Sequence, residues 1–220
     1  MADRWATFDC YGTLIDWNGG IRRELARLFG EGEADRLLAR YHELEPEIQA
    51  DDPGAAYRDV MATALESLAA EENIELALDE RDALGRSLPG WTPFPEVPAS
   101  LESARAKGFR LCILSNSDPD LIAASIAQLG VAFDDAITAS EIGSYKPALG
   151  HWRTFEQRQG RLPDVHVAAS LFHDVGPAVE LGIPSVWVNR LGEARDGYEP
   201  TREIADLAPL PGTLAELTAR

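Results

Sequence analysis

The chain has 220 residues, a formal net charge of −17 and 45% hydrophobic residues, which fits one large domain or a core with a smaller partner. The negative charge repels nucleic-acid phosphates and anionic membrane surfaces, and no stretch reaches the roughly 18 apolar residues of a membrane span. We therefore expect no nucleic acid and no membrane as partner, and a small anionic substrate would need concentrated positive charge at its site.

The N-terminal stretch "MADRWATFDC" lacks the basic start and the apolar core of a signal peptide. Cys10 and Cys112 both lie in apolar runs that are typical of buried strands. We expect two free thiols in a cytoplasmic protein, because disulfides are rare in reducing compartments.

Short apolar runs along the chain predict buried strands, and helical stretches separate the later ones. Strand alternating with helix indicates an α/β fold, a Rossmann-like doubly wound parallel sheet with helices on both faces. Ligands bind at the carboxyl ends of the strands in such sheets. The predicted strands are residues 5–8, 110–114, 135–138, 165–170 and 185–189, and the predicted helices between them are residues 119–130, 148–160 and 175–182.

The first two predicted strands are about a hundred residues apart, which is too long for a single crossover connection. The intervening chain has the apolar spacing of helices, and the proline-rich stretch "LPGWTPFPEVP" predicts a stiff return. We predict a core formed by residues 1–17 and 91–220, with residues 18–90 inserted as a helical cap subdomain that shields chemistry from water.

Polar side chains follow four of the predicted strands. Asp9 ends the first strand, and the stretch "LSNSD" places Ser115 and Asn116 at the end of the second. Lys146 follows the third strand in "GSYKP", and Asp174 follows the fourth in "SLFHD". The carboxyl ends of parallel strands meet at one edge, so we expect these side chains to lie together.

These four segments, "FDCYGTL", "LSNS", "SYKP" and "LFHD", occur in the order found in the haloacid dehalogenase-like hydrolase superfamily, which the chain resembles over nearly its whole length. The resemblance implies that Asp9 is a nucleophile that forms a covalent ester intermediate. It also implies that Ser115 or Asn116 binds substrate oxygens. Lys146 would neutralise the site, and Asp174 would support the hydrolytic step.

Tyr11 stands two residues after the expected nucleophile, where phosphatases of this superfamily have an aspartate as general acid. A tyrosine with an ordinary pKa near 10 is a poor proton shuttle at neutral pH. Because a halide leaves as a stable anion, it needs no proton. The first motif is similar to that of the L-2-haloacid dehalogenase branch, which works without magnesium. We therefore expect no cofactor.

The resemblance implies a two-step reaction on a short 2-haloalkanoic acid, fluoroacetate included. Asp9 displaces the halide from C2, and water activated by Asp174 then hydrolyses the aspartyl ester to give a 2-hydroxy acid. The stretch "ARYHELE" resembles the cap segment that supplies the arginine receiving the halide. This match indicates Arg40 as halide acceptor, with Tyr41 beside it.

Further substrate-binding residues are expected around the first and fourth motifs. Thr13 and the backbone around Tyr11 would bind substrate or order Asp9, and His173 could hydrogen-bond or narrow the pocket. The dehalogenase branch carries serine and asparagine where this chain has Ala169 and Leu171.

That departure leaves two other functions open. The first is a magnesium-dependent phosphatase acting on a small phosphomonoester, with Asp9 and Asp174 holding Mg²⁺ together with waters. The second is a relative that has changed or lost catalysis and serves as a binding protein. Tyr11 separates the dehalogenase from the phosphatase. A homodimer is possible, as is common in the superfamily.

Overall fold

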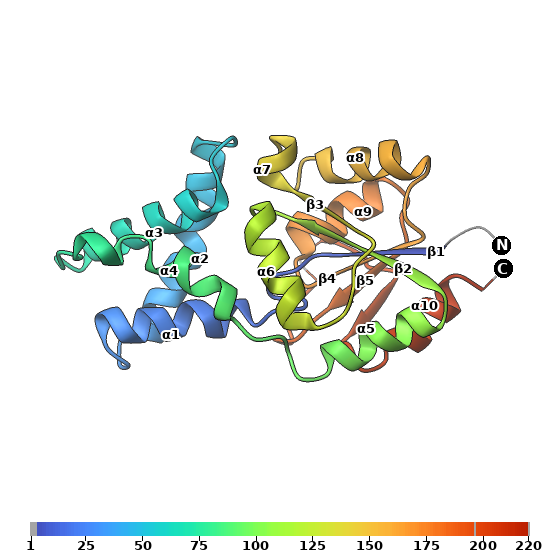
Figure 1. The fold of residues 1–220 in the computed structure, drawn as a ribbon, viewed down its shortest axis with the longest axis horizontal. Helices are drawn as coiled ribbons and strands as arrows, with labels where there is room; N and C mark the ends of the chain where they lie inside the picture. Colours follow the sequence, from blue (N-terminus) through green and yellow to red (C-terminus); the bar gives the residue numbers. More distant parts are fainter. Residues whose placement is uncertain (1–3, 196, 220) are drawn as a thin grey trace.

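A parallel sheet of six strands lies at the centre of the structure, a computed structural model that describes residues 4–195 and 197–219 (Figure 1). The strand order is β3-β2-β1-β4-β5-β6, so the chain winds outward from β1 in both directions and the doubly wound α/β prediction is confirmed. The strands are β1 Arg4–Phe8, β2 Phe109–Ser115, β3 Asp135–Thr138, β4 Val165–Ala168, β5 Ser185–Val188 and β6 Arg202–Ile204.

Helices cover both faces of the sheet, because successive residues of a strand point to opposite sides. Trp5 of β1 belongs to one buried cluster and its neighbour Ala6 to the other. The Trp5 cluster is completed by α8 Gly150–Gln159 and α9 Gly176–Glu180, and the Ala6 cluster includes α5 Val97–Ala106, α6 Pro119–Leu129 and α10 Leu210–Leu217. The free thiols of Cys10 and Cys112 are buried in this core.

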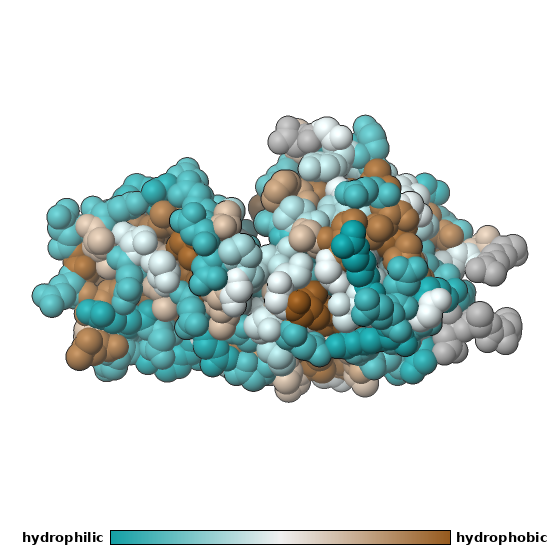
Figure 2. All heavy atoms as spheres, turned by 90° about the horizontal axis from the view of Figure 1, so that it is seen from above, coloured by the Kyte–Doolittle hydropathy of each residue, from teal (hydrophilic) through white to brown (hydrophobic). Residues whose placement is uncertain are grey.

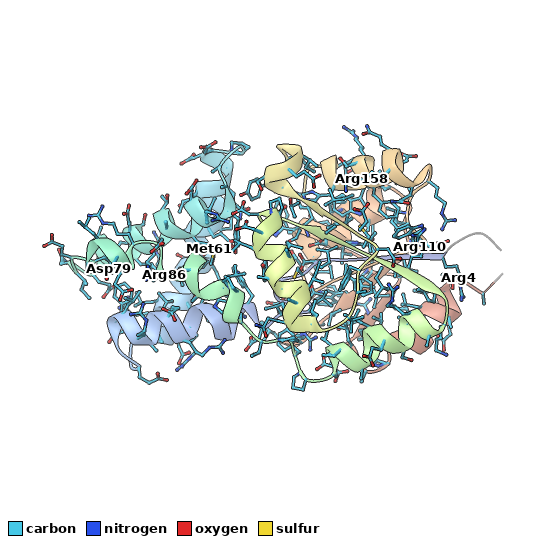
Figure 3. The ribbon with its side chains drawn as sticks, in the orientation of Figure 1. Arg4, Met61, Asp79, Arg86, Arg110 and Arg158 are labelled. Atoms are coloured by element: carbon cyan, nitrogen blue, oxygen red, sulfur yellow. The ribbon has the colours of Figure 1, made fainter. Side chains whose placement is uncertain are left out.

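Of the α-helices between β1 and β2, the first four lie together beyond the carboxyl end of β1 as inserted helices (Figure 1). They pack through apolar faces such as Val60, Ala64 and Leu68, the face expected from their spacing. Met61 lies among these helices, whereas Asp79 lies toward their outer end (Figure 3). The helices are α1 Trp17–Phe29, α2 Ala34–Asp51, α3 Tyr57–Glu71 and α4 Ala83–Ser87.

Several short elements were not predicted. The edge strand β6 reads "REI" and its charged residues are exposed, so it lacks the apolar signal of the other strands. The proline-rich return runs directly into α5, where Pro98 occupies the first turn, a position that needs no backbone N–H donor. The other elements that were not predicted are α10, α7 Ala139–Ile142, the 3-10 turns η1 Leu78–Glu80 and η2 Leu88–Gly90, and the π-helical turn η3 Leu171–Val175.

Hydrophilic residues cover most of the visible surface, including the outer side of the inserted helices (Figure 2). Within residues 4–195 and 197–219, no helix combines the length and the apolar character needed to cross a bilayer.

Candidate active site

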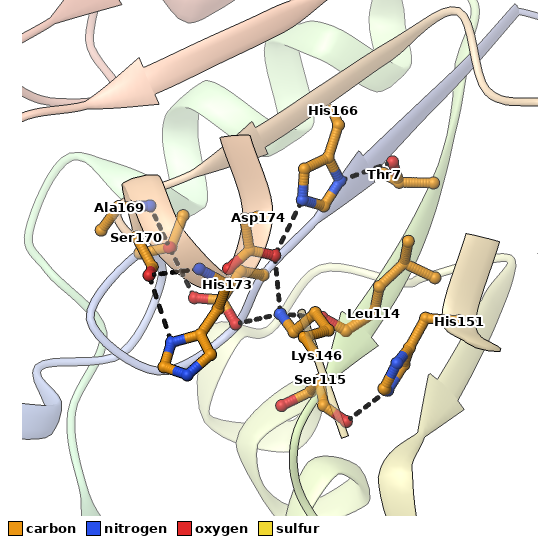
Figure 4. A network of polar contacts seen from close by, with 12 residues as sticks. Thr7, Leu114, Ser115, Lys146, His151, His166, Ala169, Ser170, His173 and Asp174 are labelled. Carbon is orange, nitrogen blue, oxygen red and sulfur yellow. Dashed lines mark hydrogen bonds and ion pairs between the residues drawn. The ribbon is translucent and has the colours of Figure 1, made fainter. Parts of the chain in front are cut away.

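Side chains from the ends of the central strands meet around the ammonium group of Lys146 (Figure 4). Its Nζ lies 2.9 Å from Asp9 Oδ1 and 2.7 Å from Asp174 Oδ1, and it donates to the carbonyl oxygen of Leu114 at 2.9 Å. Asp9 directly follows β1, while Lys146 and Asp174 follow β3 and β4. The structure therefore brings together the two carboxyl groups and the lysine that were predicted to share one sheet edge.

These charged groups are almost sealed from water: the side chains of Lys146 and Asp174 are each 1% exposed, and that of Asp9 is 12% exposed. Burial alone would lower the pKa of Lys146, but Asp174 and Asp9 outweigh it and raise that pKa. Burial would raise the pKa of Asp174, but Lys146 and His166 hold it well below its usual range. The site thus carries a fixed positive charge against two carboxyl groups.

His166 is a site residue that sequence reasoning missed. It lies on β4, its Nε2 is 2.9 Å from Asp174 Oδ1, and its Nδ1 is 2.8 Å from the hydroxyl oxygen of Thr7 (Figure 4). The available signal was a histidine within an otherwise apolar strand, since a buried imidazole needs polar partners. Here it orients Asp174 from inside the sheet.

Thr13 and a tight turn hold the carboxyl group of Asp9. The Thr13 hydroxyl donates to Asp9 Oδ2 at 2.7 Å and accepts the backbone N–H of Ala169 at 2.9 Å. Gly12 has a φ of +84°, a conformation in which a residue with a Cβ would be strained. The chain can therefore reverse direction immediately after Asp9 and bring Thr13 back to its carboxyl group.

Tyr11 lines the space in front of Asp9 with its ring but turns its hydroxyl away. The hydroxyl oxygen lies 3.0 Å from Ser125 Oγ on α6, and the ring stacks on Tyr57 with centroids 6.2 Å apart. Burial raises the pKa of Tyr11 well above its ordinary value. The ring of Tyr11 therefore forms part of the cavity wall. Its hydroxyl is neither positioned nor acidic enough to act as a proton donor.

Ser115 and Asn116 end β2 at the same edge. The Asn116 amide donates to the Lys146 carbonyl oxygen at 3.0 Å and accepts the Lys146 backbone N–H at 2.6 Å, so it fixes the chain that carries the lysine. His151 Nε2 lies 3.0 Å from the Ser115 carbonyl oxygen. Burial and, second, the charge of Lys146 lower the pKa of His151 to about 3, so this imidazole is neutral.

The fourth motif forms η3 directly after β4. The Ser170 hydroxyl accepts the backbone N–H of His173 at 3.0 Å and lies 3.2 Å from its Nδ1. Burial lowers the pKa of His173, so the ring is neutral at pH 7. Ala169 and His173 both face the space above Asp174.

A cavity of about 440 Å³ lies over these strand ends, a volume suited to a small molecule. One side is formed by the core, including Asp9, Ser115 and Lys146. The inserted helices supply the facing wall through Trp17, Asn18, His42, Glu45, Pro46, Gln49 and Tyr57.

Arg40 and Tyr41 do not line this cavity, which corrects the expectation that Arg40 meets a departing halide. Arg40 instead donates to Glu43 at 2.7 Å and to Glu71 at 2.8 Å on the outside of the helices, and Tyr41 is buried among them. The physical reason is helix rotation. At about 100° per residue, Arg40 lies roughly 200° around α2 from the cavity-lining His42.

Several cavity residues were also missed by sequence reasoning, among them Glu45 on α2 and Arg190 after β5. Arg190 Nη2 donates to the Thr13 carbonyl oxygen at 2.9 Å and lies 2.8 Å from Glu96 Oε1. Its guanidinium carbon sits 3.7 Å above the ring of Phe94. An arginine immediately after an apolar strand was the available signal, as for the other strand ends.

Asp9 and Asp174 could serve as ligands of a magnesium ion, as the phosphatase alternative requires. Each carboxyl group directs one oxygen to Lys146, and Asp9 directs the other to Thr13. In the described part of the chain, no third acidic residue, histidine or cysteine joins them as a cation site. This donor set fits a lysine-neutralised site better than a hydrated Mg²⁺, which prefers several free oxygen ligands.

The structure has a parallel sheet with a lysine-paired aspartate at the end of its first strand, and comparison with known proteins identifies the class of hydrolases to which it belongs. A family model described as haloacid dehalogenase-like hydrolase matches residues 4–167. The chain therefore belongs to the haloacid dehalogenase-like hydrolases, as its four motifs predicted.

The chain is similar to individual members over nearly its full length. It is 30% identical to (S)-2-haloacid dehalogenase H-109 of Pseudomonas putida, over 95% of this chain and 96% of that protein. It is 29% identical to haloacetate dehalogenase H-2 of Moraxella sp. strain B, over 96% and 95% respectively. Its fold matches the L-2-haloacid dehalogenase of Xanthobacter autotrophicus with covalently bound chloropropionic acid at a TM-score of 0.85, with 19% identity and all of both chains covered.

Proposed function

We propose that this protein is a hydrolase acting on carbon–halogen bonds, which converts short 2-haloalkanoic acids to 2-hydroxy acids through an ester on Asp9. The relatives named as (S)-2-haloacid and haloacetate dehalogenases support this activity. The strongest support from the structure is the arrangement of Asp9 and Tyr11 at the cavity. Asp9 is held against Lys146 at the cavity, while the Tyr11 hydroxyl, at the position of a phosphatase general acid, is bonded to Ser125.

In the first step, an Asp9 carboxylate oxygen attacks C2 of the substrate, and the halogen leaves with the bonding electron pair. Lys146 balances the charge of the carboxylate, and Thr13 limits its rotation, so the nucleophile is oriented before substrate arrives. The positive charge of Lys146 also reduces the repulsion between the substrate carboxylate and the two aspartates. Ser115 and the backbone after Asp9 are the proposed contacts of that carboxylate.

In the second step, water attacks the carbonyl carbon of the aspartyl ester, which releases the hydroxy acid and restores Asp9. We propose that the Asp174 carboxylate accepts a hydrogen bond from this water and so activates it. Because Lys146 and His166 hold the pKa of Asp174 well below its usual range, Asp174 is ionised throughout the neutral range and available to accept a hydrogen bond.

The inserted helices act as a cap in this proposal, with residues 18–90 as the cap and residues 1–17 and 91–220 as the core. The cap supplies the wall of the cavity that faces Asp9, and it would exclude bulk water during displacement. We further propose that the protein acts in the cytoplasm, and a homodimer remains a prediction.

Halide and phosphate release, measured side by side, test the proposed function. We expect chloride from L-2-chloropropionate, with or without EDTA, and no phosphate from p-nitrophenyl phosphate; fluoroacetate serves as a second haloacid. Phosphate release that EDTA abolishes, without any halide release, would establish the phosphatase alternative. Turnover of none of the three compounds would favour a binding protein.

A further inference from the structure

The side of α2 that lines the cavity opposite Asp9 is polar. Among the residues that the structure describes, it carries no arginine or lysine. His42, Glu45 and Gln49 face the cavity at spacings of three and four residues, which places them on one side of the helix. Arg40 lies on the opposite side with Glu43 and Glu71. An anion that moves toward this wall therefore meets a carboxyl group and not a guanidinium group.

Glu45 is half-buried in this wall. Among the residues that the structure describes, no arginine or lysine forms an ion pair with it. Burial raises the pKa of Glu45 to about 7, and hydrogen bonding with Tyr57 opposes the shift only in part. The Trp17 indole N–H donates to the Tyr57 hydroxyl oxygen at 2.9 Å, which leaves the Tyr57 O–H available for Glu45. Tyr57 thus links Glu45 to the Trp17 indole.

The direction of the displacement brings the leaving group to this wall. An in-line attack places the departing group on the side of C2 opposite Asp9. Asp9 enters the cavity from the carboxyl end of β1, and α2 belongs to the helices that lie beyond that end (Figure 1). A carboxylate on that wall would repel a departing anion, whereas a neutral carboxylic acid can donate a hydrogen bond to it.

We propose that Glu45, as a neutral carboxylic acid, donates the hydrogen bond that receives the departing halide, in the role for which Arg40 was expected. This inference rests on the proposed dehalogenase function. The Asp9–C2 bond forms while the C2–halogen bond breaks, and both electrons of that bond leave with the halide. No proton is transferred, because the halide only accepts a hydrogen bond from the Glu45 O–H.

The proposal predicts that displacement slows as the pH rises through about 7, where Glu45 becomes charged. Among the titratable neighbours, burial raises the pKa values of Tyr41, Tyr57 and Tyr145, which stay protonated. Burial lowers the pKa values of His42 and His173, which are already neutral at pH 7. Across the cavity, Lys146 has a raised pKa and Asp174 a lowered one, so both keep their charges.

The test is the pH dependence of the halide burst from L-2-chloropropionate in a single turnover. We expect the wild-type rate to fall about tenfold per pH unit above about 7, since one ionisation removes the donor. Glu45→Gln keeps a donor that cannot ionise, so its rate should be lower at acid pH but flat across this range. Glu45→Ala should lower the acid-side rate about 100-fold, the loss of one donor to developing charge.

Glu43→Gln is the matched control, because Glu43 lies on the same helix with its side chain 66% exposed and paired with Arg40. It should keep the wild-type profile. An unchanged alkaline fall in Glu45→Gln, or a wild-type rate in Glu45→Ala, would overturn the role of Glu45 while halide release still supported the dehalogenase. No halide from the wild type at any pH would overturn both proposals.

A second measurement does not depend on turnover. The infrared difference between wild type and Glu45→Gln should contain a protonated carboxyl band one unit below a pH of about 7 and carboxylate bands one unit above it. A carboxylate signal at both values would contradict the proposal, because the donor would then be absent during catalysis.

Discussion

Asp9→Asn should reduce turnover of 2-haloacids by about 10⁴-fold or more, because an amide cannot take the place of the carboxylate that forms the ester. Asparagine has nearly the same shape, and its amide oxygen can still accept the hydrogen bond from Thr13 or from Lys146. Chloride release measured with an ion-selective electrode, together with circular dichroism and thermal unfolding, separates lost chemistry from lost structure.

Asp79→Asn is the control for this experiment, because Asp79 is an exposed aspartate at the outer end of the inserted helices (Figure 3). It should retain full turnover. A folded Asp9→Asn protein that kept more than about 1% of wild-type turnover would mean that another group attacks the substrate.

Lys146→Met should lower both activity and stability. Without the ammonium group, Asp9 and Asp174 remain as two buried carboxyl groups with no lysine between them. Removing one partner of a buried charge cluster costs about 3 kcal/mol of unfolding free energy. We expect turnover to fall about 10³-fold, since the charge that orients Asp9 and attracts an anionic substrate is lost. Urea unfolding and chloride release measure the two effects.

The stability loss in Lys146→Met should depend on pH. In the wild type, the pKa of Asp174 lies below its ordinary value of 3.8, so its ionised form contributes stability above that value and loses it as the pH falls. The difference between wild type and variant should therefore be largest at neutral pH and shrink toward acid pH. Lys107→Met, at an exposed lysine, should change neither quantity. A stability difference that grew toward acid pH would contradict the assigned charges.

The sheet and the edge that carries the candidate site could be predicted because their signals are local. Each buried parallel strand appears as an apolar run, and the polar residue that follows it must lie at the carboxyl edge. Asp9, Lys146 and Asp174 are far apart in the sequence, yet the common direction of the parallel strands brings them to the same edge of the sheet. β6 was missed because an edge strand with exposed charged residues lacks such a run.

The cavity wall supplied by the inserted helices could not be predicted in the same way. Apolar spacing shows that α2 is a helix, but the rotation of the helix depends on how all four inserted helices pack. The sequence resemblance around Arg40 therefore predicted that the Arg40 side of α2 faces the cavity, whereas the structure places the Glu45 side there. His166 was missed because its partner Asp174 is close only in the folded chain.

The fate of the hydrolytic oxygen tests the covalent ester most directly. A single turnover of L-2-chloropropionate with excess protein in ¹⁸O-labelled water should place the heavy oxygen in the Asp9 carboxyl group, seen as a mass increase in the peptide that contains it. Heavy oxygen found in the 2-hydroxy acid and not in that peptide would mean that water displaces the halide directly and that Asp9 is not the nucleophile.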